Sequence, residues 1–127
     1  MILDTTFLVD LLRGEDAVEE VVERANSEAV FVTPISVMEL YEGASLAADA
    51  DEKYHVESLL DGLTKMGFNV PAAKRAGEIN ARLQERGQPI DAEDVMIAAV
   101  ALENDEAVVT RNLDDFDKID NLETVAY

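Results

Sequence analysis

Short apolar runs alternate along the chain with longer segments that have helical periodicity. Five runs rich in apolar and β-branched residues predict short strands at residues 2–4, 29–33, 67–70, 107–110 and 123–127, the last at a sheet edge. Apolar residues spaced by three and four predict helices at residues 5–14, 16–27, 35–49, 51–65, 72–87 and 91–105. Such alternation is typical of a parallel sheet covered on both faces. The pattern therefore predicts a three-layer α/β/α fold with a central parallel sheet of about five strands.

Several helix starts are marked by capping residues or by proline. Thr5 or Thr6 is the expected cap of the first helix, and Thr33 precedes Pro34 in the same way. In parallel α/β sheets the ligand crevice lies beyond the carboxyl ends of the strands. Asp4, Thr33 and Thr110 lie at the carboxyl ends of predicted strands, so we expect them at that crevice.

The size and composition of the chain favour one globular domain spanning residues 1–127. No linker, repeat or low-complexity tract interrupts the sequence, and 48% of the residues are hydrophobic, enough to fill a core. The absence of cysteine excludes disulfides and thiolate metal sites. No signal peptide or membrane-spanning run is visible, so a cytoplasmic location is expected.

The charge of the chain is extreme. There are 28 acidic residues against 10 Lys and Arg, which gives a net charge of −18 at pH 7. The acids are scattered over the outer faces of predicted helices, a pattern that resembles proteins of salt-loving microbes, haloarchaea in particular. At about 1 M salt the Debye length is only about 3 Å, which screens repulsion between surface carboxylates. Most of the acids are therefore expected to be solvated surface groups.

Four carboxylates stand in less ordinary places. Asp4 ends the first strand, Glu39 lies inside the helix after the second strand, and Asp115 follows the fourth strand. Asp94 shares a helix face with Ile97, Ala98 and Ala101, which is the expected core-facing stripe. Taken singly, each has an ordinary explanation. These are a helix cap for Asp4, a partly exposed helix edge for Glu39, a helix-terminal acid for Asp94 and a turn for Asp115.

Together these four carboxylates can converge on one crevice. Oxygen ligands without cysteine or a histidine cluster suit a hard cation, Mg²⁺ or Mn²⁺. Such a cation lowers the pKa of a bound water and stabilises a leaving oxygen, which is the chemistry of phosphodiester hydrolysis. The only histidine, His55, lies in a charged helix, so histidine-based acid–base catalysis is not expected.

Four segments give the chain a resemblance to PIN-domain proteins of the VapC toxin type. They are "MILDTTFLVDLLRG", "TPISVMELYEGA", "PIDAEDVMIAAVALEND" and "VVTRNLDDFDKI". The resemblance covers nearly the whole chain and places the acidic quartet of the family on Asp4, Glu39, Asp94 and Asp115. It implies a Mg²⁺- or Mn²⁺-dependent endoribonuclease that is the toxin of a type II toxin–antitoxin system. It also implies an RNA substrate, homodimers and a small VapB-like antitoxin that inserts into the active-site groove.

Other residues near these motifs are candidates for supporting roles. Asn112 stands where many family members have an acid and is expected to orient Asp115 or a water. Asp91 is either an extra ligand or a helix cap, with the cap preferred. Thr5, Thr6 and Thr110 are expected to hydrogen-bond carboxylates or phosphate, and Arg13 and Arg111 are the candidate substrate contacts. Asp10 is expected to be a polar helix edge, and the helices at 34–65 are expected to form the dimer surface.

Rival functions make different demands on the sequence. A receiver domain needs a lysine after a late strand, where this chain has Thr110 and Arg111, and a haloacid-dehalogenase-type phosphatase needs a second aspartate two residues after the first. A ribosomal RNA maturation nuclease of the PIN fold usually carries an added zinc-binding segment, which a chain without cysteine lacks. A non-catalytic RNA-binding module would show no metal dependence and would tolerate Asp94→Asn. The acidity opposes ordinary nucleic-acid binding, except in molar salt, where counterion release matters little.

Overall fold

A computed structural model describes all 127 residues of the chain. Its centre is a five-stranded sheet in the order β3-β2-β1-β4-β5, and every neighbouring pair is parallel. The strands are β1 (Ile2–Leu3), β2 (Phe31–Val32), β3 (Thr64–Lys65), β4 (Val108–Val109) and β5 (Thr124–Val125). The predicted parallel sheet of five strands is therefore confirmed, with β5 at one edge.

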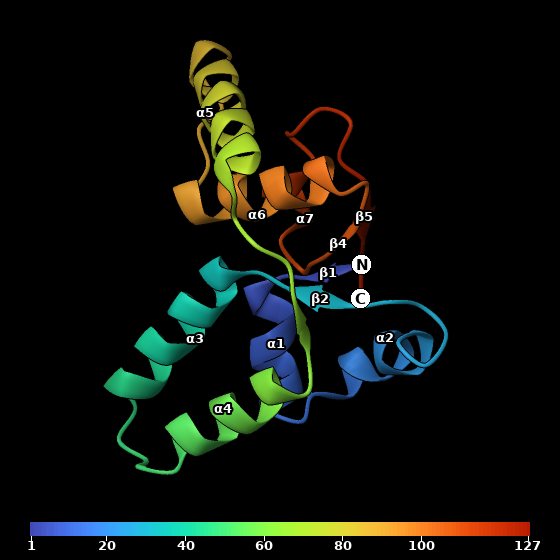
Figure 1. The fold of residues 1–127 in the computed structure, drawn as a ribbon, viewed down its shortest axis with the longest axis vertical. Helices are drawn as coiled ribbons and strands as arrows, with labels where there is room; N and C mark the ends of the chain where they lie inside the picture. The colour runs from blue at the N-terminus through green and yellow to red at the C-terminus, as the bar shows by residue number, and fades with distance from the viewer.

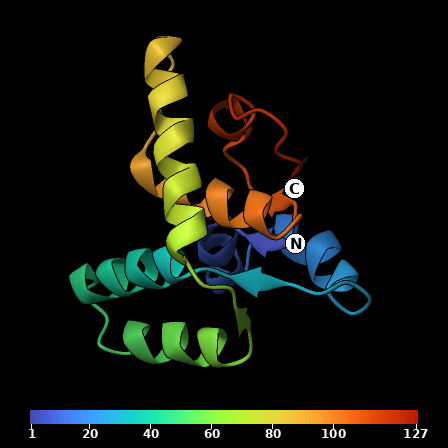
Figure 2. The same ribbon diagram turned by 45° about the horizontal axis from the view of Figure 1, so that its top comes forward.

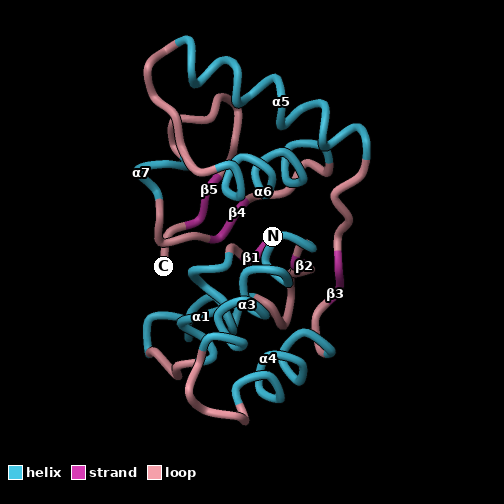
Figure 3. The backbone as a smooth tube through the Cα atoms, turned by 90° about the vertical axis from the view of Figure 1, so that its left-hand side faces the viewer, coloured by secondary structure: helices cyan, strands magenta, loops and turns pink.

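Helices cover both faces of this sheet, as Figures 1 and 3 show. One face carries α5 (Val70–Glu85), α6 (Ala92–Glu103) and the short α7 (Leu113–Phe116). The other carries α1 (Thr5–Leu12), α3 (Pro34–Leu46) and α4 (Glu52–Asp61), with the 3₁₀ turn η1 (Asp16–Val18) and α2 (Glu19–Arg24) beside them. The three layers agree with the predicted α/β/α fold.

Each face of the sheet has its own apolar core. Ile2 and Val108 belong to the core under α5 and α6, whereas Leu3 and Val109 belong to the core under α1, α3 and α4. This division follows from the alternation of side chains along a strand. The middle of α6 is fully buried from Ile97 to Ala101, because this helix lies between the sheet and α5, as Figure 2 shows. Its small alanines allow close packing on both sides.

The third strand was predicted in the wrong place. Residues 67–69 are irregular, and Val70 begins α5, for which Asn69 is the cap: its side chain accepts a hydrogen bond from Ala72 N at 3.0 Å. The strand that pairs with β2 is Thr64–Lys65, which was expected to continue the preceding helix. Both residues are exposed, since an edge strand can pair through its backbone without an apolar run.

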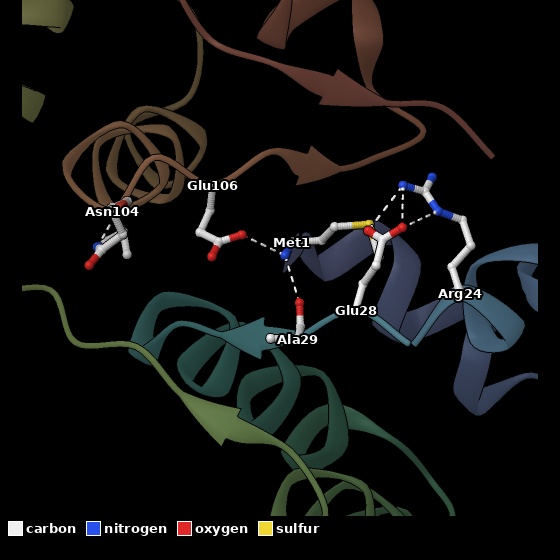
Figure 4. Close-up of polar contacts among 7 residues, drawn as sticks. Met1, Arg24, Glu28, Ala29, Asn104 and Glu106 are labelled. Atoms are coloured by element: carbon white, nitrogen blue, oxygen red, sulfur yellow. Dashed lines mark hydrogen bonds and ion pairs between the residues drawn. The ribbon is translucent and has the colours of Figure 1, made fainter. Parts of the chain in front are cut away.

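The start of β1 is fixed by polar contacts. The α-amino group of Met1 donates a hydrogen bond to Ala29 O at 2.8 Å and forms an ion pair with Glu106 at 2.7 Å, as Figure 4 shows. Ala29 precedes β2 and Glu106 precedes β4, so the amino group joins the segments that lead into both neighbours of β1. These contacts tie the start of β1, the strand that Asp4 follows, to both of its neighbours.

The strand order fixes where a site can form. The chain moves from β1 outward through β2 and β3, then returns to add β4 and β5 on the other side. The connections after β1 and β4 therefore run in opposite directions. This leaves a crevice beyond the carboxyl ends of these two strands. Asp4 follows β1 at this point, and Thr110, Arg111 and Asn112 follow β4. No helix combines the length and apolar character that a membrane crossing requires.

The acidic surface leads to a prediction about salt. Only a few of the 28 acidic side chains form ion pairs within the chain, so most of the charge of −18 repels itself at low ionic strength. We expect the thermal midpoint at pH 7 to rise by about 10 °C or more between about 0.1 M and 2 M KCl, because screening removes this repulsion. Circular dichroism melting curves measure the shift, and a constant or falling midpoint would contradict the expectation.

Candidate active site

Asp4 is a buried carboxylate at the centre of the crevice. It is only 2% exposed, and its Oδ2 atom accepts hydrogen bonds from the hydroxyls of Thr6 at 2.9 Å and Thr110 at 2.8 Å. Its Oδ1 atom accepts none from the chain, which leaves one oxygen available to a ligand. Asp4 itself occupies the cap position of α1, so the predicted capping role of Thr5 or Thr6 is wrong, and both threonines lie inside the helix.

Glu39 reaches the crevice from the second turn of α3. The hydroxyl of Thr5 donates a hydrogen bond to its Oε1 atom at 2.8 Å, and the same hydroxyl is hydrogen-bonded to that of Ser36. Burial raises the pKa of Glu39 above its usual range, and Asp4 adds to the rise by repulsion, although the Thr5 bond opposes it. Glu39 is therefore oriented by a neighbouring helix while its charge remains uncompensated.

Asp94 has a strongly raised pKa. It lies in the first turn of α6, and burial raises its pKa from 3.8 to about 7, with further repulsion from Asp4, Glu39, Asp91 and Asp115. The carboxylates are thus close enough to act on one another. A cluster of like charges that shifts a pKa this far is typical of functional sites.

Asn112 joins Asp94 to Asp115. Its Nδ2 atom donates hydrogen bonds to Asp94 Oδ2 at 3.2 Å and to Asp115 Oδ2 at 3.0 Å, and its backbone N–H donates to the Thr110 hydroxyl at 2.9 Å. Asp115 lies in α7 and also contacts Lys118 Nζ at 3.4 Å. The sequence did not predict α7, because a helix of four residues is too short to show periodicity. The contacts of Lys118 and Ser36 were not predicted either.

These groups surround a pocket of about 310 Å³. It is lined by Asp4, Thr5, Thr6, Val9, Glu39, Asp91, Asp94, Arg111 and Asn112. Arg111 is the one basic residue in that lining, and Asp115 is connected to the lining through its hydrogen bond with Asn112. Asp91 occupies the cap position of α6 without a side-chain capping bond. Arg13 instead lines a neighbouring groove between α1, α3 and α4, which also touches Glu39.

The donor set of the pocket suits a hard divalent cation. All candidate ligands are carboxylate oxygens, which Mg²⁺ and Mn²⁺ prefer, and their mutual repulsion adds to the effect of burial in raising the pKa of Asp94 to about 7. A bound cation would relieve that repulsion. No three acidic side chains are arranged around a single point as a formed coordination shell requires. The residues therefore fit the cation by chemistry and charge, whereas the ligand geometry is not preformed.

Asp10 departs from its expected place as a polar helix edge. It is 2% exposed, and both of its carboxylate oxygens accept hydrogen bonds, from Arg111 and from Tyr127. Its neighbours Leu8, Val9, Leu11 and Leu12 are apolar on every side, and this was the signal in the sequence that the residue is buried. It does not line the acidic pocket.

Comparisons with known proteins agree with this architecture. The family model "PIN domain" matches residues 1–122. A tRNA(fMet)-specific endonuclease VapC of Salmonella typhimurium is 32% identical over 121 residues, covering 92% of this chain and 89% of the relative. Ribonuclease VapC2 of Haemophilus influenzae is 30% identical over 125 residues, covering 96% and 93%.

Solved structures show the same fold. DNA-bound VapBC from Salmonella typhimurium superposes with a TM-score of 0.89 at 29% identity, covering 98% of this chain and 96% of the other. VapBC2 from Rickettsia felis, bound to a promoter DNA fragment, gives a TM-score of 0.92 at 23% identity, covering 99% and 97%. Because the family model spans nearly the whole chain and the VapC ribonucleases align over almost their full length, this chain belongs to the PIN-domain family.

Proposed function

We propose that this protein is a Mg²⁺- or Mn²⁺-dependent endoribonuclease, the toxin of a type II toxin–antitoxin pair. The observation that carries the proposal is the gathering of Asp4, Glu39 and Asp94 around one pocket, with Asp115 linked through Asn112. The VapC ribonuclease relatives support RNA as the substrate. Since the proposed substrate is cellular RNA, the proposal includes a cytoplasmic location.

Each side chain has a defined part in this hydrolysis. A bound divalent cation supplies a water of lowered pKa and charge stabilisation for the phosphate. Asp4 would hold the cation, while the hydroxyls of Thr6 and Thr110 keep its carboxylate in place through hydrogen bonds to Oδ2. Thr5 orients Glu39, and Asn112 orients both Asp94 and Asp115. Such hydrogen bonds to the ligands fix their rotamers and tune the affinity for the cation.

Metal removal tests the proposed chemistry. We expect purified protein to cut single-stranded RNA with Mg²⁺ or Mn²⁺ and to lose this activity completely in EDTA, because without the cation no group in the acidic pocket stabilises the leaving oxygen and the carboxylates repel the phosphate. Mapping of new RNA 5′ ends measures the cleavage. Restoration by added Mn²⁺ is the control for irreversible unfolding. Cleavage that persists in EDTA would contradict the proposal.

A cognate antitoxin is the expected protein partner. The groove between α1, α3 and α4 has a volume of about 240 Å³, is lined mainly by apolar side chains such as Val9, Leu12 and Leu40, and touches Glu39. A VapB-like segment in this groove would therefore reach the edge of the catalytic pocket. The similarity to a solved VapBC structure supports such a partner. Co-expression of the protein encoded by an adjacent short reading frame should suppress cleavage, and unaltered cleavage would contradict the assignment.

The proposal includes a homodimer formed through α3 and α4. Leu46 is 81% exposed, Tyr54 is 71% exposed and Met38 is 50% exposed, and all three lie on these helices. We expect Leu46→Glu to shift the protein from dimer to monomer in molar KCl, because it places a charge in an apolar interface. Gln84→Glu, at an exposed position of α5, is the matched control. Sedimentation velocity measures both, and a wild-type protein that is monomeric throughout would contradict the dimer.

A further inference from the structure

Asp10 is a buried acid that the proposed chemistry does not use. Its side chain is 3% exposed and lies on α1, one turn beyond Thr6. A carboxylate removed from water is costly unless it is paired and hydrogen-bonded. The two groups that hydrogen-bond to Asp10 come from distant parts of the chain.

The partners of Asp10 are Arg111 and Tyr127. Arg111 Nη2 donates a hydrogen bond to Oδ1 at 3.1 Å, and the Tyr127 hydroxyl donates to Oδ2 at 2.7 Å. The ring of Tyr127 packs edge-on against the buried ring of Phe7, with the centroids 5.1 Å apart. Each oxygen of Asp10 therefore has one partner, and the tyrosine that holds one of them is fixed by an aromatic contact of its own.

Arg111 extends from this anchor to the catalytic pocket. It lines the pocket with Asp4, Glu39 and Asp94, and its side chain remains 61% exposed. A guanidinium has five N–H donors, and the bond to Asp10 uses only Nη2. Nε and Nη1 donate no hydrogen bond to the chain, so they are free to bind a ligand. A planar fork of donors matches the oxygens of a phosphate.

We propose that Arg111 binds an RNA phosphate at the catalytic pocket and that Asp10 and Tyr127 are positioning residues that hold its guanidinium there. This inference rests on the proposed function, because it takes RNA as the ligand of that pocket. The carboxylates repel a phosphate, and Arg111 is the single basic residue in the lining that opposes this repulsion. An arginine held from one side brings its charge to the phosphate at a smaller entropic cost than a free side chain.

A purely stabilising ion pair explains these contacts less well. A pair whose arginine is mostly exposed contributes little to stability, whereas burying the acid is costly. An apolar residue at position 10, among Leu8, Val9 and Leu11, would avoid that cost. The buried acid is explained if it positions Arg111 so that the free N–H donors of the guanidinium bind a ligand.

Binding and kinetics together test the proposal. The probe is a fluorescein-labelled single-stranded RNA of mixed sequence, titrated in EDTA at a KCl concentration where every variant is folded by circular dichroism. We expect Arg111→Ala to weaken binding about 10-fold or more and Asp10→Asn about 3- to 10-fold. With Mg²⁺, the same variants should raise KM by similar factors and change kcat less than about 2-fold, because they alter substrate binding rather than the carboxylate ligands.

Coupling separates positioning from general stability. Asp10→Asn should weaken binding in the wild-type background but have no further effect in the Arg111→Ala background, since its only proposed route is through that arginine. Tyr127→Phe keeps the aromatic contact and removes the hydroxyl, so it tests the anchor if Asp10→Asn fails to fold. Arg24→Ala, which removes an exposed arginine paired with Glu28 on the surface, is the control for lost charge.

The outcomes distinguish this inference from the proposed function. RNA binding that depends on Arg111 without any cleavage would support the phosphate contact and overturn the nuclease. Metal-dependent cleavage with an unchanged KM in Arg111→Ala would support the nuclease and overturn the phosphate contact. Equal losses from Asp10→Asn, or from Tyr127→Phe, in both backgrounds would overturn the positioning role. No RNA binding and no cleavage by the wild-type protein would overturn both proposals.

Discussion

Asp94→Asn is expected to reduce RNA cleavage by on the order of 1000-fold or more, while the protein remains folded. Asp94 faces the pocket from the first turn of α6 and experiences the charge of Asp4, Glu39 and Asp115. Asparagine has nearly the same shape but no charge, so it weakens the hold on a cation that contributes several kcal/mol to the transition state. The hydrogen bond from Asn112 is the one contact that must rearrange.

The control for this variant is Asp114→Asn. Asp114 is exposed on α7 directly beside Asp115 and makes no side-chain hydrogen bond or ion pair, so it changes the net charge by the same amount outside the pocket. Both variants are compared in 5′-end mapping and in a growth assay after induction. Full activity of Asp94→Asn would remove Asp94 from the site, and a comparable loss in Asp114→Asn would indicate a general charge effect.

The stability of the metal-free protein is expected to fall as pH rises from about 4 to about 7. The folded-state pKa of Asp94 is raised to about 7, against an ordinary value of 3.8. Between these values the folded chain binds more protons than the unfolded chain, so the free energy of unfolding decreases with pH. The stabilisation from protonated Asp94 is complete below about pH 4 and lost above about pH 7. We expect a loss on the order of 2 kcal/mol, because the group is only partly buried.

Asp94→Asn isolates this contribution. The variant should lack the pH dependence of Asp94 and melt about 5–10 °C higher than wild type at pH 7 in EDTA. Mn²⁺ should raise the midpoint of the wild type and leave that of the variant nearly unchanged, since ligand binding stabilises only the state that binds. Differential scanning calorimetry of both proteins at pH 5 and pH 7 measures these shifts. A variant less stable than wild type at pH 7 in EDTA would contradict the repulsive cluster.

The sequence predicted the layers of this fold and the edge strand β5, but it misplaced the other edge strand, β3. The buried runs around Ile2, Val32 and Val108 have a strong apolar signal because central strands contact two covering layers. The edge strand at Thr64 and Lys65 has no such signal, since its pairing is made by the backbone alone. Residues 67–70 have the pattern of a short strand, but Asn69 is the cap of α5 and Val70 begins this helix.

The candidate site was also predicted only in part. Asp4, Glu39 and Asp94 were noticeable because carboxylates in apolar surroundings are unusual, and the structure places all three at one pocket. The contact of Asn112 with Asp115 was expected, whereas its second contact, with Asp94, depends on the turn after β4, which periodicity does not describe. The anchor of Arg111 joins Asp10 to Tyr127, which are 117 positions apart, and only the folded chain brings them together.

The location of Mn²⁺ in crystals of the protein tests the proposed metal site most directly. With 28 acidic residues, solution binding alone would count surface sites as well, whereas anomalous diffraction at the manganese edge places each ion among its ligands. We predict a strong peak within coordination distance of Asp4 and Asp94 in the wild type, and none there in Asp94→Asn crystals soaked identically. Manganese bound only at surface carboxylates, with the pocket empty in the wild type, would contradict the metal site on which the proposed nuclease depends.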